Sequence, residues 1–317
     1  MIKVSVVIPV YNTEKYVQKA IMSVLKQSLK EIEVIVVNDG STDNSEAIIK
    51  KIHDDRIKYL KKENGGLSDA RNYALKYVNG KYVYFLDSDD YIEEDFLLKA
   101  YEKLEETGSD MLQTRVIYFG ECKTKVSTYP LFTDKRTLLA KGYVITCDKL
   151  FKTSIIKDNH LEFIKGHFYE DIPFFHAYVL LANKFAILDE GNYWYLQRKG
   201  SITSTFNDKV LDIIPVLKKT INYYKEYDLF DTYHDEIEYF TTRIILGSSM
   251  KRIFKIKDKK IRKAAIKETY DFLYAAFPDY KMNPYLKKGL KNFIFKYMNI
   301  KLLLLLGGIK WKRLNFL

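Results

Sequence analysis

The sequence is poor in cysteine, because Cys122 and Cys147 are the only two among its 317 residues. Two cysteines cannot form a disulfide framework, and their separation matches no metal-ligand spacing. The pair therefore excludes a disulfide-stapled scaffold and favours a reducing compartment.

Long apolar runs are also lacking. The first twelve residues, "MIKVSVVIPVYN", hold a short apolar stretch interrupted by Pro9, too short for a signal peptide or a membrane span. The tail "IKLLLLLGGIKWKRLNFL" has five consecutive leucines and then basic residues mixed with Trp311 and Phe316, again too short to cross a bilayer of about 30 Å. The sequence thus predicts a cytoplasmic protein without a transmembrane helix.

Acidic residues are scarce in the last third of the chain. Residues 1–206 carry 29 lysines and arginines against 29 acidic residues, whereas residues 207–317 carry 23 against 12, so the whole excess of +11 lies there. Residues 251–317 alone hold 18 basic and 4 acidic residues. Such a block indicates either a solvated helical face or attraction to an anionic membrane or nucleic acid.

Buried strands and amphipathic helices alternate over the first hundred residues. Val4–Val10 and Glu33–Asp39 are nearly continuous β-branched runs, typical of strands buried on both faces of a parallel sheet. Between them lies a helical apolar stripe with Thr13 as its expected N-cap. The pattern repeats up to a third strong strand at Lys81–Asp87. This alternation predicts a doubly wound α/β layer.

The pattern changes from about Asp110. Shorter strand-like pieces follow, namely "MLQTRVIYF", "KFAILDE" and "NYWYLQRKGSIT". After Phe206 the chain reads as helices, expected at Lys209–Tyr224, Tyr233–Ile256, Lys259–Phe277 and Pro284–Met298. We therefore expect a mixed α/β domain of residues 1–206 and a basic helical region of residues 207–317.

Polar motifs follow the predicted strands, and ligands of such sheets bind at the carboxyl ends of strands. In "LDSDD" the carboxylates of Asp87, Asp89 and Asp90 repel one another. Oxygen ligands without histidine or cysteine suit Mg²⁺ or Mn²⁺, although a solvated, capped turn is the alternative. In "VNDGSTDNS", Asp39 could bind a base or ribose, or could simply belong to a capped β-to-α turn.

Three further motifs each have two interpretations. "NGGLSDARN" places Arg71 in the first turn of a helix, where it could hold an anion or only complete a turn. In "HFYEDIPF", Glu170 and Asp171 could supply a general base or a helix N-cap. In "QRKGSIT", Arg198 and Ser201 could grip a diphosphate, or could be surface residues.

Taken in order, these motifs resemble the inverting, GT-A-fold glycosyltransferases of family 2. The segments that carry the resemblance are "VSVVIPVYNTEKYVQKAIMSVLKQS…EVIVVNDGSTDNS…ENGGLSDARNYAL…YVYFLDSDDYI…EDIPF…QRKGSIT". The resemblance covers roughly residues 2–206. It implies a Rossmann-like mixed sheet, with a nucleotide-sugar half at residues 1–109 and an acceptor half at residues 110–206.

The resemblance also implies roles for the residues of these motifs. The nucleoside pocket would be lined by Pro9, Tyr11, Asn12 and Asp39, with Arg71 near it. The D-x-D motif falls on Asp87 and Asp89, with Asp89 as the direct metal ligand. Asp90 would approach the donor sugar, and Arg198 and Ser201 would contact the diphosphate. Of the acidic pair Glu170 and Asp171, Asp171 would deprotonate the acceptor.

The resemblance implies transfer of a hexosyl or N-acetylhexosaminyl group from a nucleotide-diphosphate sugar, with Mn²⁺ or Mg²⁺ as the metal ion. The nucleotide would be UDP, because UDP-sugars are the frequent donors in this family. The acceptor would be a hydroxyl of a cell-envelope glycan, teichoic acid or lipid-linked molecule. The basic C-terminal tail could hold the protein on an anionic membrane, at the inner face of the plasma membrane, or could pack on the catalytic domain or a second copy in a homo-oligomer.

Two other functions remain open at this point. The first is a non-catalytic relative that binds a sugar nucleotide, although Asp89 and Asp171 are both present. The second is a nucleic-acid-binding protein that uses its basic helices. The balanced charge of residues 1–206 and the lack of a recognised nucleic-acid module disfavour it, so we expect no nucleic acid as partner.

Overall fold

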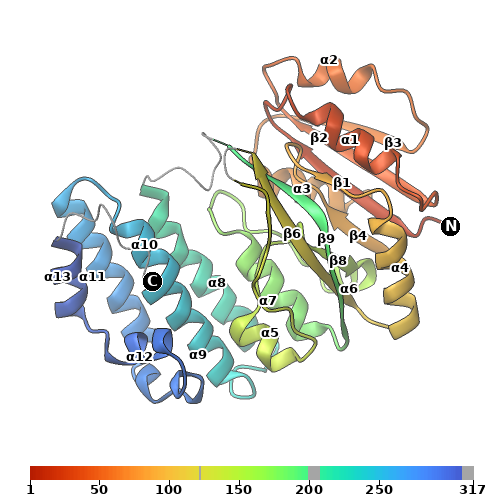
Figure 1. Ribbon diagram of the computed structural model, residues 1–317. Helices are drawn as coiled ribbons and strands as arrows, with labels where there is room; N and C mark the ends of the chain where they lie inside the picture. The colour runs from red at the N-terminus through yellow and green to blue at the C-terminus, as the bar shows by residue number, and fades with distance from the viewer. Residues whose placement is uncertain (121–122, 199–207, 309–317) are drawn as a thin grey trace. The chain divides into compact units, whose positions relative to one another are not determined.

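The computed structural model describes residues 1–120, 123–198 and 208–308 (Figure 1). The chain divides into two compact units. The first comprises residues 1–135, 142–166 and 170–201, and the second comprises residues 136–141, 167–169 and 202–317. Whether residues 207–317 form a separate domain, as the sequence suggests, stays a prediction.

The first unit is built on one mixed sheet with the strand order β3-β2-β1-β4-β8-β6-β9-β5, and β7 pairs with β6. The strands are β1 (Val4–Val10), β2 (Ile32–Asp39), β3 (Ile57–Lys62), β4 (Tyr82–Phe85), β5 (Tyr91–Ile92), β6 (Met111–Gly120), β7 (Lys125–Val126), β8 (Lys149–Lys152) and β9 (Phe185–Gln197). The first four are parallel, and β8 is antiparallel to both of its neighbours. The predicted α/β class with a mixed sheet is confirmed.

The helices of this unit connect or follow its strands. They are α1 (Val17–Leu25), α2 (Ser45–Lys50), α3 (Leu67–Leu75), α4 (Phe96–Thr107), α6 (Thr153–Asp158) and α7 (Asp171–Leu181). The helix α5 (Lys135–Lys141) lies between α4 and α6 in the chain, but all of it except Lys135 belongs to the second unit. Every residue of β1 and β2 is buried, as their β-branched sequences predict. Val17, Ile21 and Val24 of α1 join the core cluster beneath them, so the apolar stripe read from the sequence fixes how α1 packs.

The expected N-cap at Thr13 is wrong. The helix α1 begins at Val17, and a tight turn precedes it, in which the backbone N–H of Tyr16 donates to the carbonyl of Thr13. The Thr13 hydroxyl instead donates to the hydroxyl of Ser88, 3.0 Å away. This side chain therefore links the loop after β1 to the loop after β4.

The pieces "KFAILDE" and "NYWYLQ" form one strand rather than two. The 13-residue strand β9 pairs in parallel with β6. The register shifts between Leu188 and Gly191, which pair with the consecutive residues Thr114 and Arg115 of β6. Asp189 and Glu190 lie in this irregularity and are exposed. A β-bulge with polar residues looks like a loop in the sequence, because it interrupts the apolar pattern without ending the strand.

The second unit is helical, as predicted. Its elements are η2 (Asp208–Asp212), α8 (Ile213–Glu226), α9 (His234–Arg243), the π-helical η3 (Ile244–Ser249), α10 (Met250–Ile253), α11 (Lys259–Ala276), η4 (Tyr280–Met282), η5 (Pro284–Leu286), α12 (Leu290–Tyr297) and α13 (Ile300–Gly308). The helix expected over Tyr233–Ile256 is thus interrupted by a π segment. In the parts of the chain that the structure describes, no helix is both long and apolar enough to cross a membrane.

Candidate active site

The carboxyl end of β2 holds Asp39, which is buried and organises the loop before α3. Its Oδ1 accepts from Nζ of Lys62 at 2.6 Å and from the N–H of Gly65 at 3.0 Å, and its Oδ2 accepts from the N–H of Gly66 at 2.8 Å. Gly66 has a φ of 87°, which favours glycine. Asp39 therefore shapes the loop that carries Arg71 into α3, while sitting at the strand edge where ligands bind.

The loop after β1 is joined to the loop after β2. Oδ1 of Asn12 accepts from the N–H of Thr42 at 2.8 Å, and the N–H of Asn12 donates to the Ser41 hydroxyl at 3.1 Å. Tyr11, next to it, is exposed, whereas Pro9 is buried within β1. The exposed ring of Tyr11 thus lies beside two loops that are hydrogen-bonded to each other at the carboxyl ends of β1 and β2.

The three aspartates after β4 have three different partners. Oδ1 of Asp87 accepts from Nη2 of Arg71 at 2.9 Å. Oδ2 of Asp89 accepts from Nε and Nη2 of Arg198, at 3.0 Å and 2.8 Å. The carboxylates of Asp87 and Asp89 are therefore each paired with a guanidinium, which reduces the repulsion between them. Ser201, the other expected diphosphate contact, lies outside the described residues.

Asp90 faces the protein interior rather than solvent. Its carboxylate accepts from the Tyr193 hydroxyl and from the N–H of Leu196 at 2.7 Å, and both residues belong to β9. Burial raises the pKa of Asp90, and the charges of Asp89 and Asp87 raise it further. In this structure Asp90 therefore anchors the end of β9 beneath the aspartate loop. The expected contact of Asp90 with a donor sugar stays a prediction.

Asp87 and Asp89 form an oxygen-only pair that could hold a divalent cation. Both side chains are partly exposed, and burial together with the charge of Asp87 raises the pKa of Asp89, against the opposing effect of Arg198. A divalent cation would relieve this strain between like charges. The donor set suits Mg²⁺ or Mn²⁺, which prefer carboxylate oxygens.

Arg71 brings the aspartate loop and the acidic pair together. Its side chain is 1% exposed, and its Nη1 donates to Oδ1 of Asp171 at 3.0 Å and to Oε1 of Glu170 at 3.3 Å, while Nη2 holds Asp87. Among the described residues its Nε has no hydrogen-bond partner. One buried guanidinium thus joins the end of β4 to the start of α7.

The acidic pair does not act as a helix cap. Glu170 occupies the N-cap position of α7, but its side chain makes no capping hydrogen bond and turns to Arg71 instead. Asp171 is the first residue of the helix, and its Oδ1 also accepts from the Thr146 hydroxyl at 3.0 Å. Two donors therefore fix one oxygen of Asp171. This geometry favours the general-base interpretation over the N-cap interpretation.

Burial raises the pKa of both acids. Burial and the charge of Asp171 raise the pKa of Glu170 from 4.5 to about 7. Burial also raises the pKa of Asp171, while the charge of Arg71 opposes that change. A carboxylate with a raised pKa is a stronger base, and such groups are common at catalytic sites.

The stability of the protein should report the raised pKa of Glu170. The folded state binds a proton at Glu170 more tightly than the unfolded state does, so the bound proton adds to the free energy of unfolding. This addition is complete below pH 4.5, is lost as the pH rises to about 7, and amounts to at most about 3 kcal/mol. We expect the urea midpoint of Glu170→Gln to fall less than that of the wild type between about pH 5 and pH 7.5. The exposed control Glu162→Gln should behave like the wild type, and identical pH profiles for all three proteins would refute the assignment.

Several residues of the site gave no signal in the sequence. The Cys147 thiol donates to Oδ2 of Asp87 at 3.4 Å, beside the contact of Thr146 with Asp171. Lys62 and Tyr193 hold Asp39 and Asp90. None of these residues belongs to a recognisable motif, and only the folding of distant segments against one another brings them into the site.

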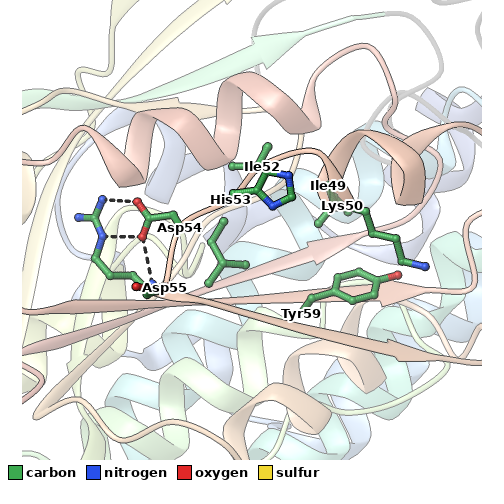
Figure 2. A pocket seen from close by; sticks show the side chains of 9 residues that line it. Ile49, Lys50, Ile52, His53, Asp54, Asp55 and Tyr59 are labelled. Carbon is green, nitrogen blue, oxygen red and sulfur yellow. Dashed lines mark hydrogen bonds and ion pairs between the residues drawn. The ribbon is translucent and has the colours of Figure 1, made fainter.

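A surface hollow elsewhere in the first unit is a less suitable site. It has a volume of about 750 Å³ and is lined by residues 49–50, 52–57 and 59 (Figure 2). These residues end α2 and begin β3, so the hollow lies at the amino end of β3, away from the carboxyl ends that carry the aspartates. Arg56 and Asp54 neutralise each other there at 2.8 Å.

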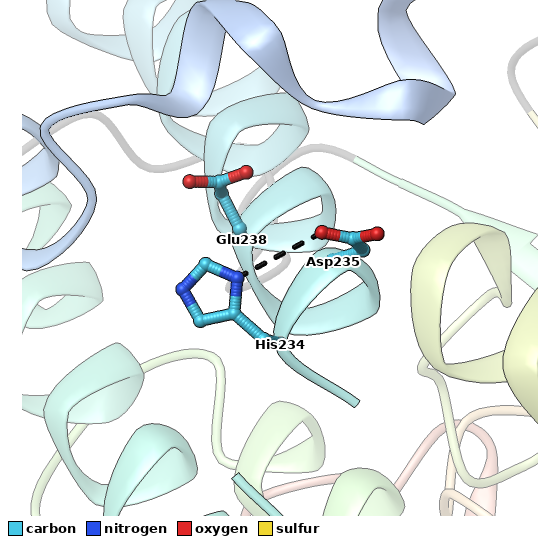
Figure 3. A group of neighbouring side chains, drawn as sticks. All are labelled: His234, Asp235 and Glu238. Carbon is cyan, nitrogen blue, oxygen red and sulfur yellow. Dashed lines mark ion pairs between the residues drawn. The ribbon is translucent and has the colours of Figure 1, made fainter. Parts of the chain in front are cut away.

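A second candidate metal cluster lies in the helical unit. His234, Asp235 and Glu238, in the first turns of α9, have ligand atoms within 4.8 Å of one another (Figure 3). A helix N-terminus disfavours a cation. The Glu238 carboxylate also already accepts from Nδ2 of Asn283 at 2.7 Å. We therefore assign this cluster a structural role rather than metal binding.

Comparisons with known proteins agree with the resemblance seen in the sequence. Residues 5–168 match the family model described as "Glycosyl transferase family 2". The chain is 34% identical over 226 residues to Glycosyltransferase GlyA and 29% identical over 241 residues to Glycosyltransferase GlyG, both of Streptococcus pneumoniae serotype 4. These matches cover 65% and 69% of this chain, and 32% and 79% of the relatives. The chain therefore spans about a third of GlyA.

The most informative structural likeness is to TarS of Staphylococcus aureus, named a poly(ribitol-phosphate) beta-N-acetylglucosaminyltransferase. The sequence match is 31% identical over 248 residues, or 75% of this chain and 43% of TarS. The crystal structure of TarS 1–349 in complex with UDP-GlcNAc has a TM-score of 0.79 at 25% identity, and the match covers 97% of this chain and 91% of that one. This likeness confirms the expected GT-A fold.

Proposed function

Because this chain belongs to glycosyl transferase family 2, we propose that it is an inverting glycosyltransferase that uses a nucleotide-diphosphate sugar. The observation that carries the proposal is the buried Arg71 network. It holds the base candidate Asp171 and the metal-site candidate Asp87 on one guanidinium, at the carboxyl ends of the parallel strands. A donor diphosphate and an acceptor hydroxyl would therefore meet within one crevice.

On the donor side, Asp89 and Asp87 would hold Mn²⁺ or Mg²⁺, and such an ion supplies positive charge to a departing diphosphate. Arg198 lies against Asp89 and would add a second positive charge. The exposed ring of Tyr11 and the loops fixed by Asn12 and Asp39 would receive the nucleoside. UDP is our choice of nucleotide, since TarS has been crystallised with UDP-GlcNAc.

On the acceptor side, Asp171 would take the proton of the acceptor hydroxyl on a carboxylate oxygen. The freed oxygen attacks the anomeric carbon and forms the new glycosidic bond as the carbon–oxygen bond to the diphosphate breaks. The electron pair of that bond leaves with the nucleotide diphosphate, and configuration inverts in one displacement. No covalent sugar–enzyme intermediate is required.

The acceptor we propose is a cell-envelope glycan or teichoic-acid type of polymer, or a lipid-linked precursor of one. This choice is supported by the name of TarS, a poly(ribitol-phosphate) glycosyltransferase that matches over 75% of this chain. A hexosyl or N-acetylhexosaminyl group would be transferred. A non-catalytic relative that only binds the donor is the alternative, and it predicts binding without turnover.

Nucleotide binding and donor hydrolysis test the metal assignment. We would measure UDP affinity by calorimetry, and the slow release of nucleotide from a panel of nucleotide sugars, with Mn²⁺ and with EDTA. Asp89→Ala should weaken metal-dependent UDP binding by more than about tenfold, since even outer-shell partners of a metal contribute this much. Asp95→Ala is the matched control, because Asp95 is exposed and makes no capping bond. Equal UDP affinity with Mn²⁺ and with EDTA would contradict the metal site.

A further inference from the structure

The short helix α12 carries an apolar stripe that is exposed among the described residues of the helical unit. Leu290, Phe293 and Tyr297 are 76%, 59% and 58% exposed. Their spacing of three and four residues puts them on one face of the helix. The rings of Phe293 and Tyr297 contact each other, with centroids 4.6 Å apart. The stripe is therefore a pre-formed apolar surface rather than a set of scattered side chains.

The opposite face of α12 is fixed to the unit. Phe295 is buried, and Nδ2 of Asn292 donates to the carbonyl of Tyr285 at 2.8 Å. Oδ1 of Asn292 also accepts from the Tyr239 hydroxyl at 3.0 Å. The helix thus has a buried aromatic and a partly buried polar anchor on one side and a solvent-facing apolar stripe on the other, so the stripe could change without loss of the anchor.

The charged residues of the segment that carries the stripe have one sign. Residues 280–308 contain six lysines and no acidic residue. Lys287, Lys288 and Lys291 flank the start of α12 and are exposed. Two further exposed leucines follow on α13, Leu302 and Leu305, at 37% and 65%. Leucine and aromatic residues among lysines are the composition of helices that lie in the plane of a membrane interface.

We propose that α12, with the lysines beside it, docks the protein on a bilayer that contains anionic lipids. The apolar stripe would enter the boundary between headgroups and acyl chains, and the lysines would contact the negative headgroups. A second copy of the chain is a weaker occupant, because six lysines without acidic residues would repel their own image across a symmetric interface. None of these residues belongs to the proposed active site, so this inference does not depend on the proposed reaction.

Vesicle sedimentation of the full chain tests the proposal. We would compare vesicles of phosphatidylcholine alone with vesicles of an equal mixture with phosphatidylglycerol, at low and at high salt. We expect binding to the mixed vesicles, and loss of at least about tenfold in partition coefficient at high salt, where charges are screened. Equal binding to both kinds of vesicle, or to neither, would overturn the proposal.

Two variants distinguish binding through the stripe from non-specific binding of exposed apolar side chains. Leu290→Ser/Phe293→Ser should lower the partition coefficient by about tenfold or more, because it removes two large apolar side chains from the contact. Tyr274→Ser is the matched control: Tyr274 is 58% exposed, but lies on α11 near Asp271 and Glu268. Circular dichroism would verify that both variants fold.

Other partners of the stripe predict different results for the same two proteins, the wild type and the double variant. Light scattering would detect a dimer that Leu290→Ser/Phe293→Ser dissociates, and such a dimer would overturn the membrane assignment. Binding of a single-stranded oligonucleotide without binding to the mixed vesicles would overturn it as well. Donor hydrolysis should be the same in the wild type and the double variant, since these residues lie far along the chain from the acidic pair.

Discussion

Asp171→Asn should lower the rate of sugar transfer by about 10²–10⁴-fold, the usual contribution of a general base. Asparagine is close to aspartate in shape, and its amide oxygen can still accept from Nη1 of Arg71 and from the Thr146 hydroxyl. It cannot take a proton from the acceptor. The loss should therefore appear in kcat, measured as nucleotide release in the presence of acceptor, with little change in UDP affinity.

The control for this variant is Asp158→Asn, an equally small change at the exposed end of α6. It should leave kcat unchanged. Glu170→Gln is the informative comparison, because Glu170 shares Arg71 with Asp171 but lacks the contact with Thr146. If Glu170→Gln abolished transfer while Asp171→Asn retained it, the roles of the two acids would have to be exchanged.

The parallel part of the sheet could be predicted because local sequence determines it. The runs that form β1 and β2 are mostly apolar and rich in β-branched residues, as strands buried on both faces require, and polar motifs stand at their carboxyl ends. Asp87 and Asp89 could be selected as candidate metal ligands for the same reason, and that assignment stays a prediction. Their position at the end of a buried strand is visible in one short segment of sequence.

The connection between the motifs could not be predicted in the same way. Arg71 contacts Glu170 and Asp171 across 99 and 100 residues of chain, and neither segment carries a signal for the other. The sequence suggested an anion site at Arg71, whereas the structure shows the guanidinium already bound to three carboxylates. Similarly, the bulge in β9 looked like a loop, because Asp189 and Glu190 interrupt its apolar pattern.

Replacing Arg71 should test whether this network holds the site together. Arg71→Met fills a similar volume but leaves the carboxylates of Asp87, Glu170 and Asp171 without their shared cation. Removing one partner of a buried ion pair typically costs about 3–5 kcal/mol. We expect a loss of this size in the free energy of unfolding at about pH 8, measured by urea titration with the fluorescence of Trp194 in β9 as one signal.

The pH dependence distinguishes lost charge pairing from lost packing. The charge of Arg71 lowers the pKa of Glu170 and of Asp171 against the effect of burial. Without it both pKa values rise further, so the folded variant takes up protons at higher pH than the wild type. The deficit in stability should therefore be largest at about pH 8 and should shrink toward about pH 5, where the carboxyls are protonated. A deficit that is constant with pH would mean that Arg71 acts through its contacts with neighbouring rings, such as Phe163 at 5.1 Å, rather than through the three carboxylates.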